Sequence, residues 1–342
     1  MTRVLQPGIA APSFVLPDAN SGREVSLEEY TGRKVVLVFI PTSPRGPLVE
    51  QLGEYQAKMP AFEEQGAALL GVSDATKNEL NRLTANQGMK FGLMSDSNPP
   101  GAISRHYGAT STDDQSVLPT VFVIDEGGLI RRVYESSKYP SLPNPAMVTR
   151  AIRKLANVPK PLPVTQDDWQ LGPPNAPVVV IEYADYQCGP CRETYRLLKQ
   201  IASTYGDEVL WIHRHLPLRH SHPLAQGAAE AAEAAGAQGK FWEMHDRLFE
   251  AEGVLERQQL IGYARDTGLD VKRFTDDLDS RRFRDAVNED FKVAVRSKIK
   301  LPPALFINSL PLEGPRTKEV ICARIDSLLA CTSIMTGLSL RT

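Results

Sequence analysis

Two cysteines separated by two residues carry the clearest chemistry in this sequence. Cys188 and Cys191 flank Gly189 and Pro190, at the point where the apolar, β-branched run 178–181 gives way to a helical pattern. Cys188 is therefore expected at the start of a helix, where unpaired backbone N–H groups stabilise a thiolate. Cys191 lies one turn further along, and this spacing suits a thiol that resolves a mixed disulfide formed by Cys188.

A carboxylate precedes the cysteines on the same predicted strand. Glu182 lies between Ile181 and Tyr183, six residues before Cys188. If Glu182 is buried, its pKa rises and it becomes a suitable proton acceptor for Cys191 when that thiol attacks. A glutamate that faces solvent on an alternating strand is the other interpretation. The pattern alone leaves both interpretations open.

The segment around these residues resembles the DsbA-type branch of the thioredoxin superfamily. The resemblance rests on IEYADYQCGPC, HRHLPLRHSHPLAQGAAEAAEAAGAQGKFWEMHDRLF and LPPALFIN, and it covers roughly residues 165–329. It implies that Pro303 is the family's cis-proline beside the sulfurs and that Glu182 is its buried acid. The residues assigned to substrate binding are Gly189, Pro190 and Pro302.

The first half of the chain resembles a second family, the peroxiredoxins and alkyl hydroperoxide reductases. APSFVLPDANSGREVSLEEYTGRKVVLVFIP and PTVFVIDEGGLI carry this resemblance over roughly residues 6–156. The family's active loop runs Pro-x-x-x-Thr-x-x-Cys, whereas from Pro41 this chain has Arg45 and Leu48 at the last two positions. No cysteine precedes Cys188. The domain is therefore expected to be non-catalytic.

Two α/β domains are expected, because 342 residues exceed the usual length of one domain. Alternating strands and helices in the first half predict a mostly parallel sheet covered on both faces. The predicted strands are 35–40, 68–72, 121–124, 130–134, 178–181, 209–215 and 304–307. The predicted helices are 48–64, 76–87, 147–155, 223–237, 240–250, 255–267, 271–280 and 283–297.

These elements and both resemblances imply an α/β fold class of two tandem thioredoxin-like folds, the second with a helical insertion. The expected boundaries are 1–158 for the peroxiredoxin-like domain, 159–164 for a proline-rich linker and 165–335 for the DsbA-like domain. Cys322 and Cys331 fall in a predicted terminal helix and are expected to be inert.

Composition limits the classes of partner. With 42% apolar and 23% charged residues and a net charge of −2, the chain gives no electrostatic reason to bind nucleic acid or an anionic membrane. No apolar stretch reaches the ~20 residues of a spanning helix, so a soluble, cytoplasmic protein is expected. The expected partners are protein thiol or disulfide substrates and a redox partner, with no metal or cofactor, and a homodimer stays open.

The leading hypothesis is a thiol:disulfide oxidoreductase. A zinc site is one alternative, in which Cys188 and Cys191 would be joined by histidines from His213, His215, His220 and His222. A redox-switched scaffold and a peroxide-linked antioxidant protein that uses the C-terminal thiols are two others. The hydrophobic segment 241–245 is assigned to a helix core without chemistry. Because no histidine lies between the cysteines, the reduction potential should be nearer about −270 mV than about −120 mV.

Overall fold

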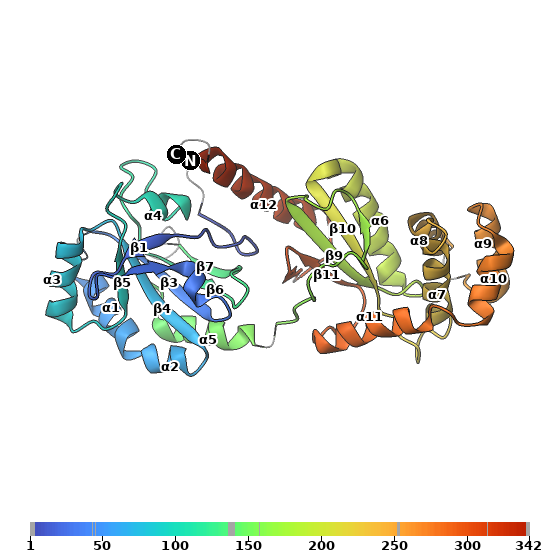
Figure 1. The fold of residues 1–342 in the computed structure, drawn as a ribbon, viewed down its shortest axis with the longest axis horizontal. Helices are drawn as coiled ribbons and strands as arrows, with labels where there is room; N and C mark the ends of the chain where they lie inside the picture. The colour runs from blue at the N-terminus through green and yellow to red at the C-terminus, as the bar shows by residue number, and fades with distance from the viewer. Residues whose placement is uncertain are drawn as a thin grey trace. The chain divides into compact units, whose positions relative to one another are not determined.

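The chain folds into two compact units, each with its own sheet. The computed structural model describes residues 4–42, 44, 46–135, 141–156, 158–251, 254–312 and 314–339. The first unit comprises Met1–Asn157 with Ala330–Thr342, and the second comprises Val158–Leu329. Both contain a five-stranded sheet flanked by helices (Figure 1). The α/β class with two thioredoxin-like domains is confirmed.

The sheet of the first unit is mixed. Its strand order is β5-β4-β3-β6-β7, in which β3 pairs in parallel with β4, and β4 with β5, while β6 is antiparallel to both neighbours. The prediction of a mostly parallel sheet was therefore wrong. The hairpin of β6 and β7 was expected, because its turn is too short for a crossover. The antiparallel pairing of β6 with β3 was not expected. The strands are β3 (Lys34–Ile40), β4 (Ala67–Ser73), β5 (Gly92–Ser95), β6 (Thr120–Ile124) and β7 (Ile130–Tyr134).

Around this sheet the helices follow the sequence pattern with one break. The expected helix 48–64 is two helices, because Pro60 lacks the backbone N–H that a helix interior requires and is tolerated only in a first turn. The remaining elements are the β1–β2 hairpin (Val15–Pro17, Glu24–Ser26), η1 (Leu27–Tyr30), α1 (Pro47–Ala57), α2 (Met59–Glu63), α3 (Lys77–Gln87), α4 (Ala102–His106) and α5 (Pro145–Leu155).

The second unit is built on the strands that lead to the cysteines. Its order is β12-β11-β9-β10-β8, in which only β9 and β10 are parallel. β10 and β11 have the predicted bounds. The strands are β8 (Trp169–Leu171), β9 (Val178–Ala184), β10 (Val209–His215), β11 (Ala304–Ile307) and β12 (Leu310–Pro311).

A helical insertion lies between β10 and β11, as expected. Helices α7 to α10 group beside the sheet, and α7 buries a run of alanines that lets its neighbours approach closely (Figure 1). None of the helices in the described part of the chain has the length and apolar character that a membrane crossing requires. The helices are α6 (Gly189–Tyr205), η2 (Gly206–Glu208), α7 (Ala225–Gly236), α8 (Phe241–Glu250), α9 (Arg257–Asp266), α10 (Val271–Asp279), α11 (Arg284–Arg296) and α12 (Lys318–Ser339).

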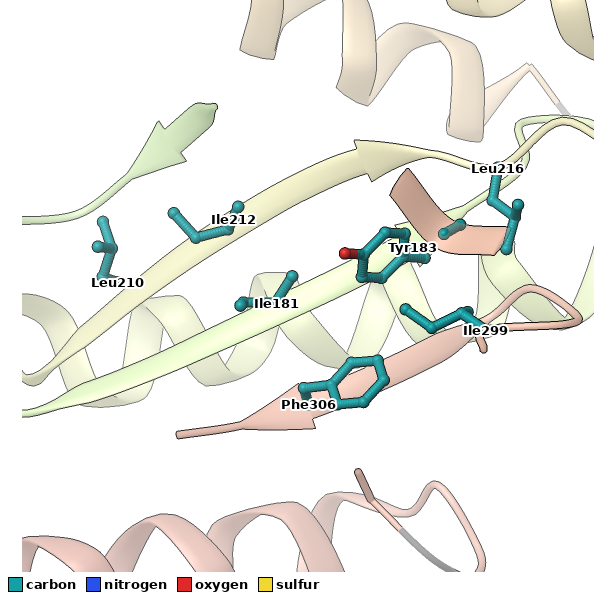
Figure 2. Packing of buried hydrophobic residues seen from close by; sticks show 8 residues of the cluster. Ile181, Tyr183, Leu210, Ile212, Leu216, Ile299 and Phe306 are labelled. Carbon is teal, nitrogen blue, oxygen red and sulfur yellow. The ribbon is translucent and has the colours of Figure 1, made fainter. Parts of the chain in front are cut away.

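The two faces of this sheet bury different kinds of side chain. One face carries an apolar cluster that includes Ile181 and Tyr183 of β9 and Ile212 of β10 (Figure 2). Successive strand residues point to opposite faces, so Glu182 lies on the other face. There it is in register with His213 of the parallel neighbour β10. The alternation in β9 thus places Glu182 in a buried layer that also holds Trp211 and His213 of β10.

The expected linker 159–164 lies within the second unit. Arg214, a buried residue of β10, donates to the backbone carbonyls of Leu162 and Pro163 at 3.0 Å each. The same guanidinium binds both carboxylate oxygens of Asp168, at 2.6 and 2.9 Å. These bonds fix the end of the proline-rich segment to the sheet, which the proline content alone did not indicate.

Candidate active site

Cys188 is the N-cap residue of α6. Its backbone is extended; its N–H donates to the carbonyl of Asp185, and its own carbonyl accepts from the N–H of Arg192. Both thiols are free, and Cys188 is 5% exposed whereas Cys191 is 0% exposed. Cys188 is therefore the sulfur that a partner reaches first, and Cys191 lies behind it in the first turn.

The two thiols share one proton unequally. The Cys191 thiol donates to the Cys188 sulfur, and this bond lowers the Cys188 pKa to about 7, with a further contribution from the Cys191 N–H. Burial opposes the shift. Burial also raises the pKa of Cys191, and the proton held against Cys188 raises it further. At neutral pH the arrangement offers one outer thiolate and one inner thiol.

A buried carboxylate organises the loop before Cys188. Asp185 accepts from the backbone N–H groups of Gln187 (2.7 Å) and Leu218 (2.8 Å), and it contacts His222 Nδ1 at 2.8 Å. The Asp185 charge raises the Cys188 pKa, whereas His222 lowers it. In the sequence His222 was a candidate ligand of the zinc alternative, and in the structure it lies in the electrostatic surroundings of the reactive sulfur.

Glu182 is fully buried, so the buried interpretation of the sequence holds. Burial raises its pKa to about 8, and the negative charge of Cys188 adds to the rise. A hydrogen bond from Trp211 Nε1 to Oε2, at 3.3 Å, works in the opposite direction. The other carboxylate oxygen, Oε1, has no hydrogen-bond partner. Glu182 is thus a carboxyl group whose protonation depends on the charge of Cys188.

Two buried histidines stand next to Glu182: His213, a candidate ligand of the zinc alternative, and His245, from the segment assigned to a helix core. His213 Nδ1 lies 3.7 Å from Glu182 Oε2, and the ring of His245, from α8, packs against His213 with centroids 4.6 Å apart. Burial lowers the pKa of both histidines well below the usual value. The assignment of segment 241–245 to a core without chemistry is therefore incomplete, because His245 brings a polar atom to Glu182.

The prolines expected near the substrate precede β11. The peptide bond between Pro302 and Pro303 is cis, and Pro303 is buried. The next residue, Ala304, pairs with Tyr183 near the carboxyl end of β9, the strand that leads to Cys188. Gly189 and Pro190 are exposed in the first turn of α6. The site thus has an exposed rim at the helix start and buried acid chemistry beneath it.

The zinc alternative that used both thiols does not match this geometry. Among the described residues, the side chains whose ligand atoms converge are Glu182, His213 and His245, and this set contains neither cysteine. His220 is exposed, and His215 contacts Glu233 at 3.0 Å. In the other unit, Arg45 lies outside the described residues and Leu48 is part of α1.

Family comparisons divide the chain as the fold does. Residues 7–133 match the AhpC/TSA family, and residues 165–327 match the Thioredoxin family. A Na(+)/H(+) antiporter NhaA 1 from Salinispora arenicola is 39% identical over 174 residues, which is 51% of this chain and 26% of that protein. An NhaA antiporter from Herminiimonas arsenicoxydans is 36% identical over 156 residues, 46% of this chain and 25% of that protein. The chain thus spans about a quarter of the length of these relatives.

Two solved structures are similar to parts of this chain. Oxidised BdbD from Bacillus subtilis covers 51% of this chain and 99% of its own, with a TM-score of 0.47 and 21% identity. AhpC from Mycobacterium tuberculosis covers 45% of this chain and 94% of its own, with a TM-score of 0.40 and 19% identity. From the family matches, the chain carries an AhpC/TSA-family domain at its N-terminus and a thioredoxin-like domain at its C-terminus.

Proposed function

We propose that the second unit is a thiol:disulfide oxidoreductase that exchanges disulfides with protein substrates through Cys188 and Cys191. The observation that carries this proposal is the asymmetric pair, in which an outer sulfur has a pKa near 7 and the inner thiol keeps its proton. A thiolate at a helix N-terminus is the reactive form in such chemistry. The thioredoxin-like fold supports an oxidoreductase at a general level.

The first step forms a mixed disulfide. The Cys188 thiolate attacks one sulfur of a substrate disulfide, a new S–S bond forms, and the other substrate sulfur leaves as a thiolate. The negative charge of Cys188 disappears in this step. That charge is one of the causes that raise the Glu182 pKa, so the carboxyl group becomes easier to ionise once Cys188 has reacted.

The second step releases the reduced substrate. Glu182 first loses its own proton to the departing substrate thiolate, and the carboxylate so formed accepts the proton of Cys191. The resulting Cys191 thiolate attacks Cys188. The mixed disulfide breaks, the second substrate sulfur leaves as a thiolate, and Cys188 and Cys191 end as a disulfide. A redox partner then returns two electrons to this disulfide. Pro303 would shape the edge that the substrate chain meets, with Gly189, Pro190 and Pro302 on its rim.

Reduction of insulin disulfides and trapping of the mixed disulfide test this assignment. The intact chain should reduce insulin with dithiothreitol as electron donor, and Cys188→Ser should abolish the activity. Cys191→Ser should accumulate a mixed disulfide, because the resolving thiol is missing. Cys322→Ser is the matched control, since Cys322 is a half-buried thiol of α12 outside the site. Failure to turn over insulin and failure to trap a substrate would together reject the proposal.

The reduction potential tests the direction of electron flow. We propose that the pair works as a reductant in the cytoplasm, because its centre has glycine and proline rather than histidine between the cysteines. Equilibration with dithiothreitol or glutathione buffers should place the potential nearer about −270 mV than about −120 mV. The AhpC/TSA domain is proposed to be non-catalytic, because the position that matches the family's cysteine is Leu48.

A further inference from the structure

Three unpaired polar atoms meet in the interior of the second unit, beneath the reactive thiols. They are Glu182 Oε1, His213 Nδ1 and His245 Nε2, and none of them has a hydrogen-bond partner. The three side chains are fully or almost fully buried, and their ligand atoms lie within 4.8 Å of one another. An unsatisfied buried polar atom costs about 1–3 kcal/mol. Three neighbouring side chains that each leave a buried polar atom unpaired indicate a missing common partner.

In each of the three side chains the other polar atom contacts a neighbouring residue, and this contact orients the unpaired atom. His213 Nε2 contacts His215 Nδ1 at 3.3 Å, and His245 Nδ1 contacts the Tyr186 hydroxyl at 3.0 Å. Glu182 Oε2 accepts from Trp211 Nε1. Metal-ligating histidines almost always bind a supporting group through their other ring nitrogen, which sets the tautomer and leaves the ligating nitrogen unprotonated. This pattern is present at both histidines.

We propose that Glu182, His213 and His245 bind one divalent transition-metal ion, with Zn²⁺ as the best-suited ion. Two imidazole nitrogens and one carboxylate oxygen suit zinc, cobalt, nickel, copper or iron, whereas calcium and magnesium prefer oxygen ligands. Ligand distances near 2.0–2.2 Å place tetrahedral ligand atoms about 3.4 Å apart, so the three side chains need to close by about 1 Å. Three protein ligands leave a fourth position for a small ligand such as water.

The ion would regulate the thiols that lie above it. A carboxylate bound to a metal ion cannot accept the Cys191 proton, so metal binding should slow the resolution of the mixed disulfide while leaving the first attack by Cys188 intact. This consequence rests on the proposed function, whereas the binding site itself does not. Binding and exchange are therefore measured separately.

Cobalt titration tests the binding site directly. The full chain, reduced and stripped with a chelator, should bind one Co²⁺ with visible d–d absorption, and Zn²⁺ should displace it. His245→Gln and Glu182→Gln should each weaken binding at least 10-fold. His220→Gln is the matched control, because His220 is exposed and lies outside the cluster. Circular dichroism and tryptophan fluorescence establish that each variant is folded.

Cys188 and Cys191 could also bind the added Co²⁺. A variant that lacks both thiols shows whether the ion binds at the cluster of Glu182, His213 and His245. Cys188→Ser with Cys191→Ser should still bind one Co²⁺, without a thiolate-to-cobalt charge-transfer band. Loss of binding in this variant would overturn the assignment in favour of a thiol site. A wild-type chain that binds no Co²⁺ would also overturn it, and a bound water would then be the common partner.

Single-turnover exchange tests the regulation. Zn²⁺ should slow resolution at least 10-fold in the wild type, a chelator should restore it, and His245→Gln should be insensitive to Zn²⁺. Equal inhibition of His245→Gln and the wild type would reject the regulatory role. If the chain shows no disulfide exchange at all, the proposed function fails while the cobalt result stands; if exchange is normal without cobalt binding, only the metal site fails.

Discussion

One proton shared between two sulfurs decides the reactivity of the Cys188–Cys191 pair. The inner thiol donates to the outer sulfur and thereby lowers its pKa to about 7, although burial opposes this. The ordinary pKa of a cysteine is about 8.5. Cys188 is therefore largely a thiolate in the pH range where other cysteines are still protonated.

Alkylation kinetics check this pKa. In a Cys322→Ser, Cys331→Ser background, the rate of reaction of Cys188 with iodoacetamide should rise with pH and reach half its plateau near pH 7. Cys191→Ala removes the donor and should move the midpoint upward by about one unit or more. A midpoint near about 8.5 in the unmodified pair would contradict the hydrogen-bond explanation.

Glu182 links pH to the stability of the second unit. Its folded-state pKa is raised to about 8, while the unfolded value is about 4.3. Between these values the folded state holds a proton that the unfolded state has lost. The contribution of Glu182 is therefore fully present below about pH 4.3 and is lost as pH rises through about 8.

The variant Glu182→Gln should lose less stability than its parent as pH rises. Between about pH 6 and pH 9, the free energy of unfolding should fall by about 1–3 kcal/mol less in Glu182→Gln than in its parent. Urea unfolding followed by tryptophan fluorescence measures the difference, with a chelator present. Both proteins carry Cys188→Ser, because ionisation of Cys188 changes stability in the opposite direction. Burial, the largest cause of the raised Glu182 pKa, remains in this background, whereas the smaller contribution of the Cys188 charge is lost. Parallel pH profiles would show that Glu182 is already ionised at about pH 6.

For single residues, the sequence predicted the site membership of those that lie close together in the chain. Cys188, Cys191 and Glu182 belong to one strand and the helix that follows it, so spacing and periodicity were sufficient. His245 reaches Glu182 only because α8 packs on the face of the sheet that carries Trp211 and His213 of β10. No local pattern in segment 241–245 distinguishes that histidine from an ordinary core residue.

At the scale of elements, α7 packs against β8 through a position that has no side chain. Gly236 ends α7, and a Cβ atom there would overlap the ring of Trp169. That ring stacks on Phe241 with centroids 4.1 Å apart and donates to Glu233 at 2.7 Å. The absent side chain at Gly236 therefore allows the C-terminal end of α7 to contact the Trp169 ring of β8.

Gly236→Ala should destabilise the second unit by about 1–3 kcal/mol, because the indole must move out of its stack. Gly227→Ala is the matched control on the same helix, since a Cβ atom at Gly227 meets no atom within 4 Å. The control should be neutral or stabilising by up to about 1 kcal/mol. Urea unfolding measures both variants, and an equal effect of the two would show that helix propensity, rather than the contact with Trp169, controls stability.

Elements with long, regular patterns could be predicted, whereas most short ones could not. The four-residue β11 is the exception, because it lies in the segment LPPALFIN that carries the family resemblance. The run VLWIHRH gave β10 its bounds, and the helices of the insertion were each predicted to within a few residues. The three-residue strands β1 and β2 and the four-residue β5 are too short for a period to stand out. Strand order was also missed in part, because pairing depends on contacts between distant segments.

At the scale of the whole molecule, the thiols that could do chemistry lie in one half of the sequence. The AhpC/TSA-family match covers residues 7–133, and no cysteine precedes Cys188 in this chain. Cys188, Cys191 and Cys322 belong to the second unit and Cys331 to the first. A reaction that uses the Cys188–Cys191 pair should therefore require the second unit.

Consumption of hydroperoxide tests this division. If the intact chain consumes hydroperoxide with dithiothreitol as donor, Cys188→Ser should reduce the rate at least 10-fold, because Cys188 is the N-cap thiol of α6 and its pKa is lowered to about 7. A peroxide-sensitive dye assay follows the reaction, with Cys322→Ser as the control. A rate that survives Cys188→Ser would locate the activity in another part of the chain.

The bonds made by Arg214 have a practical consequence for anyone who excises the second half. A peptide that starts at Thr165 would retain both cysteines, Glu182 and the prolines of β11, and by motif alone it would look complete. It would nevertheless remove the carbonyls of Leu162 and Pro163 that this guanidinium binds. Arginine stays charged at every accessible pH, so the loss would leave a cation in the interior with too few acceptors. The cut belongs at Val158 or earlier.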